Sequence, residues 1–139
     1  LFEEEIFVFT PKGDVIQLPI GATALDFAFS VHTKIGLSTV GAEVRKTRPA
    51  LVIQNDITNR HSPITIVAAL TPQFDEPLYP TEVLVRAREG GLQTDSVILL
   101  NQIRSIDRRR LIRYLGRLRP ETLVRVDRAV ALSLGLIAV

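Results

Sequence analysis

Two apolar runs near the middle of the chain decide its fold: Ala50-Leu51-Val52-Ile53-Gln54 and Ile64-Thr65-Ile66-Val67-Ala68-Ala69-Leu70. Both are short, and turn-forming residues follow them at Asn55-Asp56 and at Pro72. This pattern is typical of β-strands bounded by turns. Working outward, similar runs recur at 82–86 and 96–100. Several short strands at this spacing predict a small twisted sheet or barrel.

The end of the chain predicts two helices. The first runs from Arg108 to Leu115 and stops at Gly116, and the second has Pro120 at its first position, where proline is favoured. In the second helix an apolar stripe recurs at helical spacing, and we expect it to face the core or a dimer partner. Its members are Leu123, Val126, Val130 and Leu134.

The beginning of the chain predicts a different unit. Glu5 to Thr10 and Val15 to Leu18 are strand-like runs, and the turn Pro11-Lys12-Gly13-Asp14 joins them. Thr23 then offers an N-cap for a short helix that ends near His32. We therefore expect strand, strand and helix in residues 1–35.

Composition excludes several classes of site. The chain has 139 residues, of which 46% are hydrophobic and 23% charged, so it can form a modest core and is not expected to be disordered. It has no cysteine, which excludes disulfides, thiolate metal sites and cysteine nucleophiles, and only two isolated histidines. No apolar run approaches the roughly 20 residues of a membrane helix, and no secretion signal is visible. We expect a cytoplasmic protein with no metal, no cofactor and no membrane partner.

The charge is unevenly spread along the chain. Residues 1–44 hold two basic and six acidic side chains, a net charge of −4, whereas residues 45–139 hold fifteen basic and nine acidic ones, a net charge of +6. This asymmetry favours an anionic partner for the second part, with nucleic acid as the leading candidate. The alternative is that the arginines merely solvate helix surfaces, and charge alone leaves both interpretations open.

The first part of the chain resembles a known family. Glu5 to Asp14, with Leu18-Pro19, Gly21-Ala22-Thr23 and Asp26 to Phe29, is similar to the opening half of a TGS domain of the RelA/SpoT type. The resemblance covers about residues 1–43 and implies part of a β-grasp fold. The later strands of that fold are absent, and so are the synthetase and hydrolase residues of the parent family.

The rest of the chain resembles MazF/PemK toxin endoribonucleases. The similar stretches are Glu43 to Asp56, Asn59-Arg60, Ser62-Pro63, Val67 to Thr71, Pro80 to Val83, and Asp95 to Asp107. The resemblance implies an SH3-like barrel, a homodimer, single-stranded RNA as substrate and a MazE-like antitoxin peptide as a second partner.

The toxin pattern is incomplete at its start. The family usually opens with a strand of the type Gly-Glu/Asp-Ile-Trp and a loop ending in Gly-Ser-Glu, of which Thr39 to Glu43 remains, with Ala42 in place of serine. We therefore expect an α+β fold in which the toxin's first strand is replaced by the TGS strand-strand-helix unit. The expected parts are 1–43 and 44–139, which may share one core. We interpret the chain as an engineered or recombined chimera, because a natural fusion more often keeps both domains whole and adds a linker.

The resemblance also names candidate site residues. It assigns Arg48 and Thr71 to catalysis and Glu43 to the role of a base. The planar guanidinium group of an arginine can donate hydrogen bonds to two phosphate oxygens at once. Each has a simpler interpretation: Arg48 as a surface charge, Thr71-Pro72 as the start of a turn. The weaker candidates for RNA contacts are Asn59, Ser62, Gln102 and Arg104.

The expected function is a metal-independent, sequence-specific endoribonuclease, an mRNA interferase, that cuts single-stranded RNA through attack of a ribose 2′-OH. The alternative is a catalytically silent chimera, either a folded scaffold or a module that binds RNA or antitoxin. The loss of the loop before Glu43 favours the alternative, because a shift of about 1 Å in a catalytic group can cost on the order of a hundredfold in rate.

Overall fold

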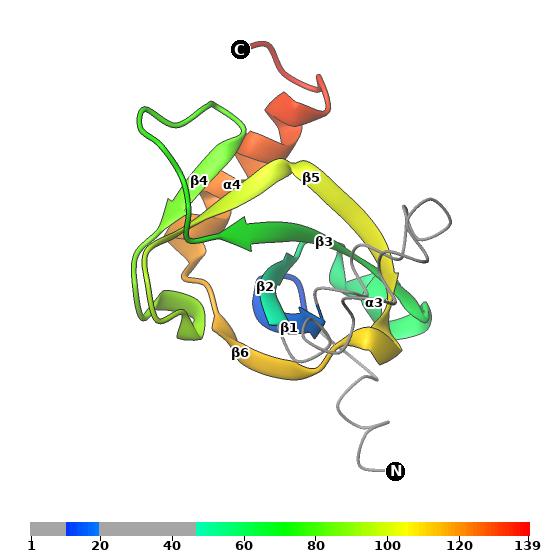
Figure 1. The fold of residues 1–139 in the computed structure, drawn as a ribbon. Coiled ribbons are helices and arrows are strands. Elements are labelled where there is room, and N and C mark those ends of the chain that lie inside the picture. The colour runs from blue at the N-terminus through cyan, green and yellow to red at the C-terminus, as the bar shows by residue number, and fades with distance from the viewer. Residues whose placement is uncertain (1–10, 20–46) are drawn as a thin grey trace, which may run out of the picture.

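The computed structural model describes residues 11–19 and 47–139. Within them a single sheet has the strand order β4-β5-β3-β2-β1-β6, and each neighbouring pair is antiparallel. The sheet curls strongly into a half-barrel (Figure 1). The strands are β1 (Asp14–Pro19), β2 (Thr47–Val52), β3 (Ile64–Thr71), β4 (Glu82–Val85), β5 (Ser96–Asp107) and β6 (Arg113–Arg117).

One helix of the described part connects two strands and the other packs on the sheet. Helix α3 (Asp56–His61) connects β2 to β3, and α4 (Pro120–Ser133) follows β6 and contacts β4 and β5. Two short 3-10 turns, η1 (Glu89–Gly91) and η2 (Arg108–Arg110), stand on either side of β5 along the chain. Among the described residues no helix is long and apolar enough to cross a membrane.

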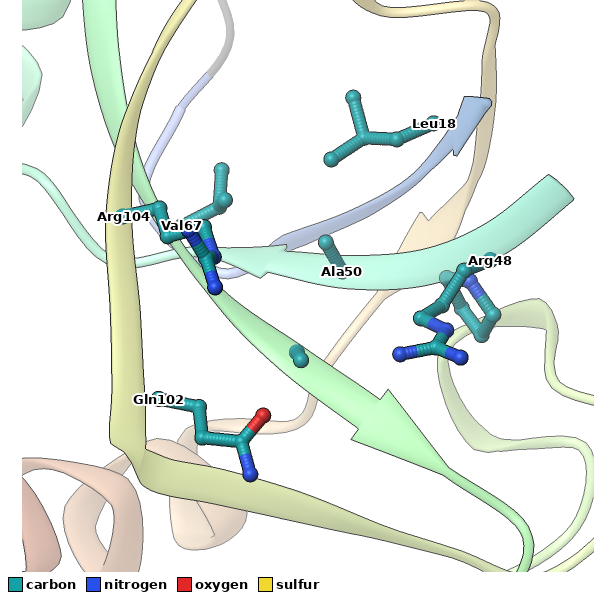
Figure 2. Close-up of a pocket in the computed structure, with 8 residues that line it drawn as sticks. Leu18, Arg48, Ala50, Val67, Gln102 and Arg104 are labelled. Carbon is teal, nitrogen blue, oxygen red and sulfur yellow. The ribbon is translucent and has the colours of Figure 1, made fainter. Parts of the chain in front are cut away.

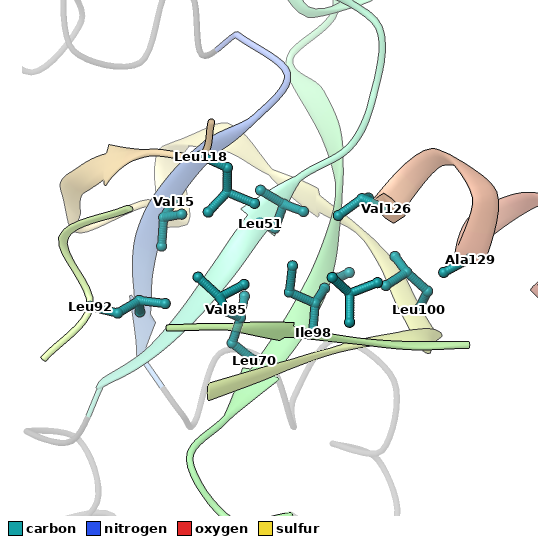
Figure 3. Close-up of a cluster of buried hydrophobic side chains, with 12 residues drawn as sticks. Val15, Leu51, Leu70, Val85, Leu92, Ile98, Leu100, Leu118, Val126 and Ala129 are labelled. Carbon is teal, nitrogen blue, oxygen red and sulfur yellow. The ribbon is translucent and has the colours of Figure 1, made fainter. Parts of the chain in front are cut away.

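The central strands bury both of their faces. On one face a large core cluster packs against Val126 and Ala129 of α4, with Leu51 and Leu70 contributed by the sheet (Figure 3). On the other face a smaller cluster includes Ile16, and its remaining members are Leu18, Ala50, Val52, Val67, Ile106 and Leu111. Burial on both faces explains why the strands read as continuous apolar runs rather than as alternating ones.

Strand β1 lies inside the sheet, between β2 and β6. Val15 pairs with Leu51 on one side and with Gly116 on the other. The turn before it is also held, since the Gly13 amide donates to the Val52 carbonyl at 2.8 Å and the Leu118 amide donates to the Gly13 carbonyl at 3.0 Å. The predicted strand at 15–18 is therefore confirmed. The predicted strand at 5–10 and the helix from Thr23 to His32 lie outside the described residues.

One predicted helix is wrong. Residues 108–115 form the η2 turn and then the strand β6, because β1 offers a strand edge there: the Ile112 amide donates to the Gln17 carbonyl at 2.8 Å, and Tyr114 pairs with Ile16. Sheet pairing overrides a local helical pattern in this segment. The second helix is confirmed, with Val126 fully buried, whereas Leu134 lies just past the helix end and is 60% exposed.

Two further boundaries differ from the sequence expectation. The turn predicted at Asn55-Asp56 is the start of helix α3. Asn55 is its N-cap, since its side chain accepts a hydrogen bond from the Thr58 backbone amide at 2.8 Å. The strand predicted at 96–100 continues to Asp107, past an irregularity where its register with β3 shifts.

Candidate nucleic-acid site

Three of the predicted site residues gather around one hollow. Arg48 lies on β2, and Gln102 and Arg104 lie on β5; Figure 2 shows their side chains extending from these two strands on either side of β3. The hollow occupies about 280 Å³, part of which is open to solvent. We call it the Arg48 hollow, and its lining residues are Leu18, Arg48, Pro49, Ala50, Val67, Ala69, Gln102 and Arg104.

The register of the sheet explains why these residues meet. Ala50 pairs with Ala69 across β2 and β3, and Val67 pairs with Arg104 across β3 and β5. Residues directly opposite one another in antiparallel strands project from the same face. One face of three neighbouring strands therefore presents Arg48, Ala50, Val67, Ala69 and Arg104 together.

Gln102 lies two residues from Arg104 on β5, so strand alternation places it on the same face, at a point where β5 is irregular. Ala68 pairs with Ile103, but the next residue, Ala69, pairs with Leu99, so Leu100 to Gln102 have no partner on β3. Instead the Leu100 amide donates to the Thr81 carbonyl at 2.9 Å. Bulges of this kind bend a strand and redirect its side chains, and they recur beside functional sites.

Thr71 ends β3 and is not among the residues that line the Arg48 hollow. If the β2–β3 register is continued by two residues beyond Ala50 and Ala69, Thr71 stands directly opposite Arg48, on the face that carries the hollow. Thr71 is half-buried, and its hydroxyl accepts a hydrogen bond from the Gln73 backbone amide at 3.1 Å and donates one to the Gln73 carbonyl at 3.3 Å. This local turn fixes the hydroxyl at the strand end.

The electrostatics of the hollow favour an anion. Among residues 11–19 and 47–139 its charged lining residues are Arg48 and Arg104 and no carboxylate lines it, and the Arg48 side chain is exposed. The floor is apolar, formed largely by Ala50, Val67 and Ala69. An apolar floor with guanidinium and amide groups at its margin suits the flat face of a base beside a phosphate.

Asn59 does not belong to this surface, and the structure does not support its prediction as an RNA contact. Its side chain is fully buried: its amide nitrogen donates to the Gln54 carbonyl at 2.8 Å, and its oxygen accepts from Thr65 at 2.7 Å. The side-chain amide of Gln54 also donates to the Asn59 side-chain oxygen, at 2.8 Å, and the Arg108 guanidinium donates to the backbone carbonyl of Asn59. Asn59 therefore anchors α3 to the sheet.

The other candidates fall into two groups. Ser62 ends α3, its hydroxyl accepts from the Ile64 amide at 3.0 Å, and it does not line the hollow, so its part in RNA binding stays a prediction. Glu43 lies outside the described residues. Within residues 11–19 and 47–139 no group of three or more acidic or histidine side chains is arranged to hold a metal ion.

The arginines of residues 108–119 mostly serve the fold. Arg117 bonds Asp14 at 3.0 Å, and Arg119 bonds Glu89 at 3.2 Å. Hydrogen bonds from the side chain and amide of Arg109 lower the pKa of Asp107 to about 2. These contacts favour the interpretation of this run as paired or solvated surface charge.

The sequence reasoning did not identify Leu18 as a residue of the site. Leu18 lines the hollow, yet it belongs to the segment assigned to the other family. A signal was present: Gly13-Asp14-Val15-Ile16 fits the glycine–acid–aliphatic pattern with which MazF-type toxins open. The same tetrapeptide also fits the TGS pattern, and that resemblance hid its place in the toxin sheet.

Comparison with solved structures supports the fold. The described architecture is similar to an endoribonuclease in complex with its cognate antitoxin from a mycobacterial species, with a TM-score of 0.68 and 21% identity over 94% of this chain and 99% of that chain. It is also similar to MazF from Deinococcus radiodurans, with a TM-score of 0.62 and 23% identity over 91% of this chain and 97% of that one. Structural similarity at 21% and 23% sequence identity shows a shared fold and does not by itself show a shared function.

Comparison of sequences shows the family. The model of the PemK-like, MazF-like toxin of type II toxin–antitoxin systems matches residues 33–134, and a TGS domain model matches residues 6–56. The chain is 50% identical over 98 residues to endoribonuclease EndoA of Bacillus subtilis, which covers 70% of this chain and 84% of that protein. The chain therefore belongs to the PemK/MazF family of toxins, and joined to the toxin sequence it carries a segment of the TGS type.

Proposed function

We propose that this chain is an endoribonuclease that cuts single-stranded RNA by attack of a ribose 2′-OH on the adjacent phosphate, without a metal ion. The observation that supports the proposal is the β2–β3 register: continued by two residues, it sets Thr71 opposite Arg48, and Arg48 lines the Arg48 hollow. The relatives with endoribonuclease activity support it.

The chemistry assigns a role to each residue. A base takes the proton of the 2′-OH, the 2′-oxygen bonds to phosphorus, and the bond from phosphorus to the 5′-oxygen breaks as that oxygen is protonated. Arg48 and the Thr71 hydroxyl stabilise the charge that develops on the phosphate. The products are a 2′,3′-cyclic phosphate and a 5′-hydroxyl. Glu43 remains the predicted base.

The proposal extends to the parts of the chain and to its partners. β1 of the TGS-like segment takes the place of the toxin's first strand, so the parts 1–43 and 44–139 share one sheet. In support, β1 is paired on both sides, with β2 and β6. We further propose a cytoplasmic homodimer that a MazE-like antitoxin inhibits. The antitoxin complexes among the similar structures support the antitoxin as a partner.

The test is cleavage of single-stranded RNA in EDTA by the parent chain, Arg48→Ala and the matched control Arg113→Ala. Arg113 is an exposed arginine on β6 that does not line the hollow. The parent and the control should cut, leaving 5′-hydroxyl ends, and Arg48→Ala should lose on the order of a hundredfold or more in rate. No cutting by the folded parent would favour the silent-scaffold alternative.

A further inference from the structure

We infer that Leu18, a residue of the TGS-like segment, forms part of the floor on which an RNA base lies, and that it therefore helps to set the affinity of the site for RNA. The inference rests on the proposed function, because it names a substrate-contacting part of the same site. It gives β1 a role beyond completing the sheet.

The position of Leu18 follows from the strand register. Leu18 pairs directly with Arg48 across β1 and β2, so the two side chains leave the sheet from one face. Leu18 lines the Arg48 hollow and is only 3% exposed, so it contributes to the hollow's buried apolar surface. Figure 2 shows it on β1, on the far side of Ala50 from Gln102. The main chain just before it is fixed, since the Gln17 carbonyl accepts from the Ile112 amide at 2.8 Å.

The lining of the hollow matches the two kinds of surface on a nucleotide. A base has apolar faces and polar edges, and the hollow has an apolar floor with Gln102 and Arg104 at its margin. With the phosphate held at Arg48, the base can lie on the floor while the amide of Gln102 reaches its edge. Shortening Leu18 lowers the floor beneath the base and removes part of this contact.

Ile16 provides a matched control on the same strand. It lies two residues from Leu18, on the same face, is 2% exposed and belongs to the same apolar cluster. Its partner on β2 is Ala50, and it does not line the hollow. Truncation of either residue should destabilise the fold by a similar amount, whereas only truncation of Leu18 should change RNA binding.

The experiment measures binding of a fluorescent single-stranded oligonucleotide of mixed sequence, 2′-O-methylated throughout so that no 2′-OH can attack. Binding is followed by fluorescence anisotropy with the full chain and with Leu18→Ala, Leu18→Val, Ile16→Ala and Ile16→Val. Circular dichroism shows that each variant is folded at the assay temperature. The valine variants keep the comparison valid if an alanine variant unfolds.

Leu18→Ala should weaken binding about fivefold or more, Leu18→Val by less, and the two Ile16 variants by under about twofold. Equal effects at the two positions, or a folded parent that does not bind the probe, would overturn the inference. Cleavage of unmodified RNA is measured in parallel. A parent that binds in a Leu18-dependent way but does not cut would refute the proposed catalysis, and the inference that Leu18 contributes to RNA binding would still hold.

Discussion

At the scale of single residues, hydrogen bonds separate the polar side chains that serve the fold from those that face the hollow. Asn59 and Gln102 are both amides on the toxin part, and both were candidates for RNA contact. Asn59 is fully buried in a network with Gln54 and Thr65, whereas Gln102 is exposed on the bulge of β5. A buried side-chain amide whose hydrogen bonds are all made within the protein, such as that of Asn59, stabilises the fold and cannot contact a ligand.

This difference predicts opposite consequences for two substitutions. Asn59→Ala should lower the free energy of unfolding by about 2–3 kcal/mol, because it leaves buried partners unsatisfied, and should not change RNA affinity per folded molecule. Gln102→Ala should change stability by less than about 0.5 kcal/mol but weaken RNA binding. Urea denaturation and anisotropy measure the two quantities. A stable Asn59→Ala protein that fails to bind RNA would contradict this assignment.

Glu89 connects the η1 turn to the start of α4. Its side chain is 5% exposed and accepts hydrogen bonds from the Arg119 amide at 3.0 Å and the Thr122 hydroxyl at 2.6 Å. Burial alone would raise the pKa of Glu89, but the hydrogen bonds from Thr122 and Arg119 outweigh it and hold the pKa below the usual 4.5. The carboxylate thus stabilises the fold in its charged form.

Glu89→Gln should therefore lower the free energy of unfolding by about 1–2 kcal/mol at neutral pH. Because the pKa is lower in the folded state, this contribution is complete above about pH 4.5 and is lost as the pH falls through the folded-state pKa. The difference between parent and variant, measured in urea at pH 7 and pH 3, should shrink at the lower pH. An equal difference at both pH values would count against the account. The control is Glu121→Gln, which changes an exposed carboxylate in the first turn of α4.

At the scale of elements, β1 is held by its turn as much as by its strand pairs. Gly13 has a φ of +99°, and a Cβ there would come within 2.9 Å of Leu123 Cδ1 on α4. Lys12 adds two further links: its side chain forms an ion pair with Asp127 of α4 at 2.8 Å, and its backbone amide donates a hydrogen bond to the Asp56 carboxylate at 2.6 Å. The Pro-Lys-Gly-Asp turn thus joins β1 to α3 and α4.

Gly13→Ala should lower the free energy of unfolding by more than the roughly 1–2 kcal/mol that a left-handed backbone alone costs an alanine. Gly135→Ala isolates that backbone cost, since its φ is +75° and no atom lies within 4 Å of the added Cβ. Thermal unfolding of the two variants gives the comparison. If Gly13→Ala were no worse than Gly135→Ala, the close packing of the turn on α4 would not hold.

The elements also show what a single sequence can and cannot predict. Apolar runs bounded by turns predicted β2, β3 and β4, and Pro120 with the apolar stripe predicted α4, because these signals are local. The strand β6 was mistaken for a helix, and β5 was cut short, because pairing with β1 and the shift opposite Ala69 depend on distant partners. Family resemblance supplied Arg48 and Gln102, but no local pattern indicated that Leu18 would join them.

At the scale of the whole molecule, β1 of the TGS-like segment and the strands of the toxin sequence contribute side chains to one core cluster. Val15 of β1 and Val85 of β4 are both fully buried members of the same core cluster, although β1 and β4 lie four positions apart in the strand order. A core shared in this way leaves no boundary at which one part of the described sheet can unfold alone.

Val15→Ala and Val85→Ala should therefore each lower the midpoint of one and the same unfolding transition, by an amount equivalent to about 2 kcal/mol. Differential scanning calorimetry should give a single peak whose calorimetric and van't Hoff enthalpies agree. Two separable transitions, with Val15→Ala shifting only one of them, would show that β1 belongs to a separate unit.

The most direct test of the account is a double-mutant cycle on Arg48 and Thr71, measured as single-turnover cleavage of single-stranded RNA in EDTA. Since both side chains are assigned to one phosphate, each alanine variant should lose about a hundredfold in rate, and the double variant should lose little more than the worse single variant. A folded parent chain that does not cut RNA, or losses that multiply as if the two residues acted independently, would contradict the account.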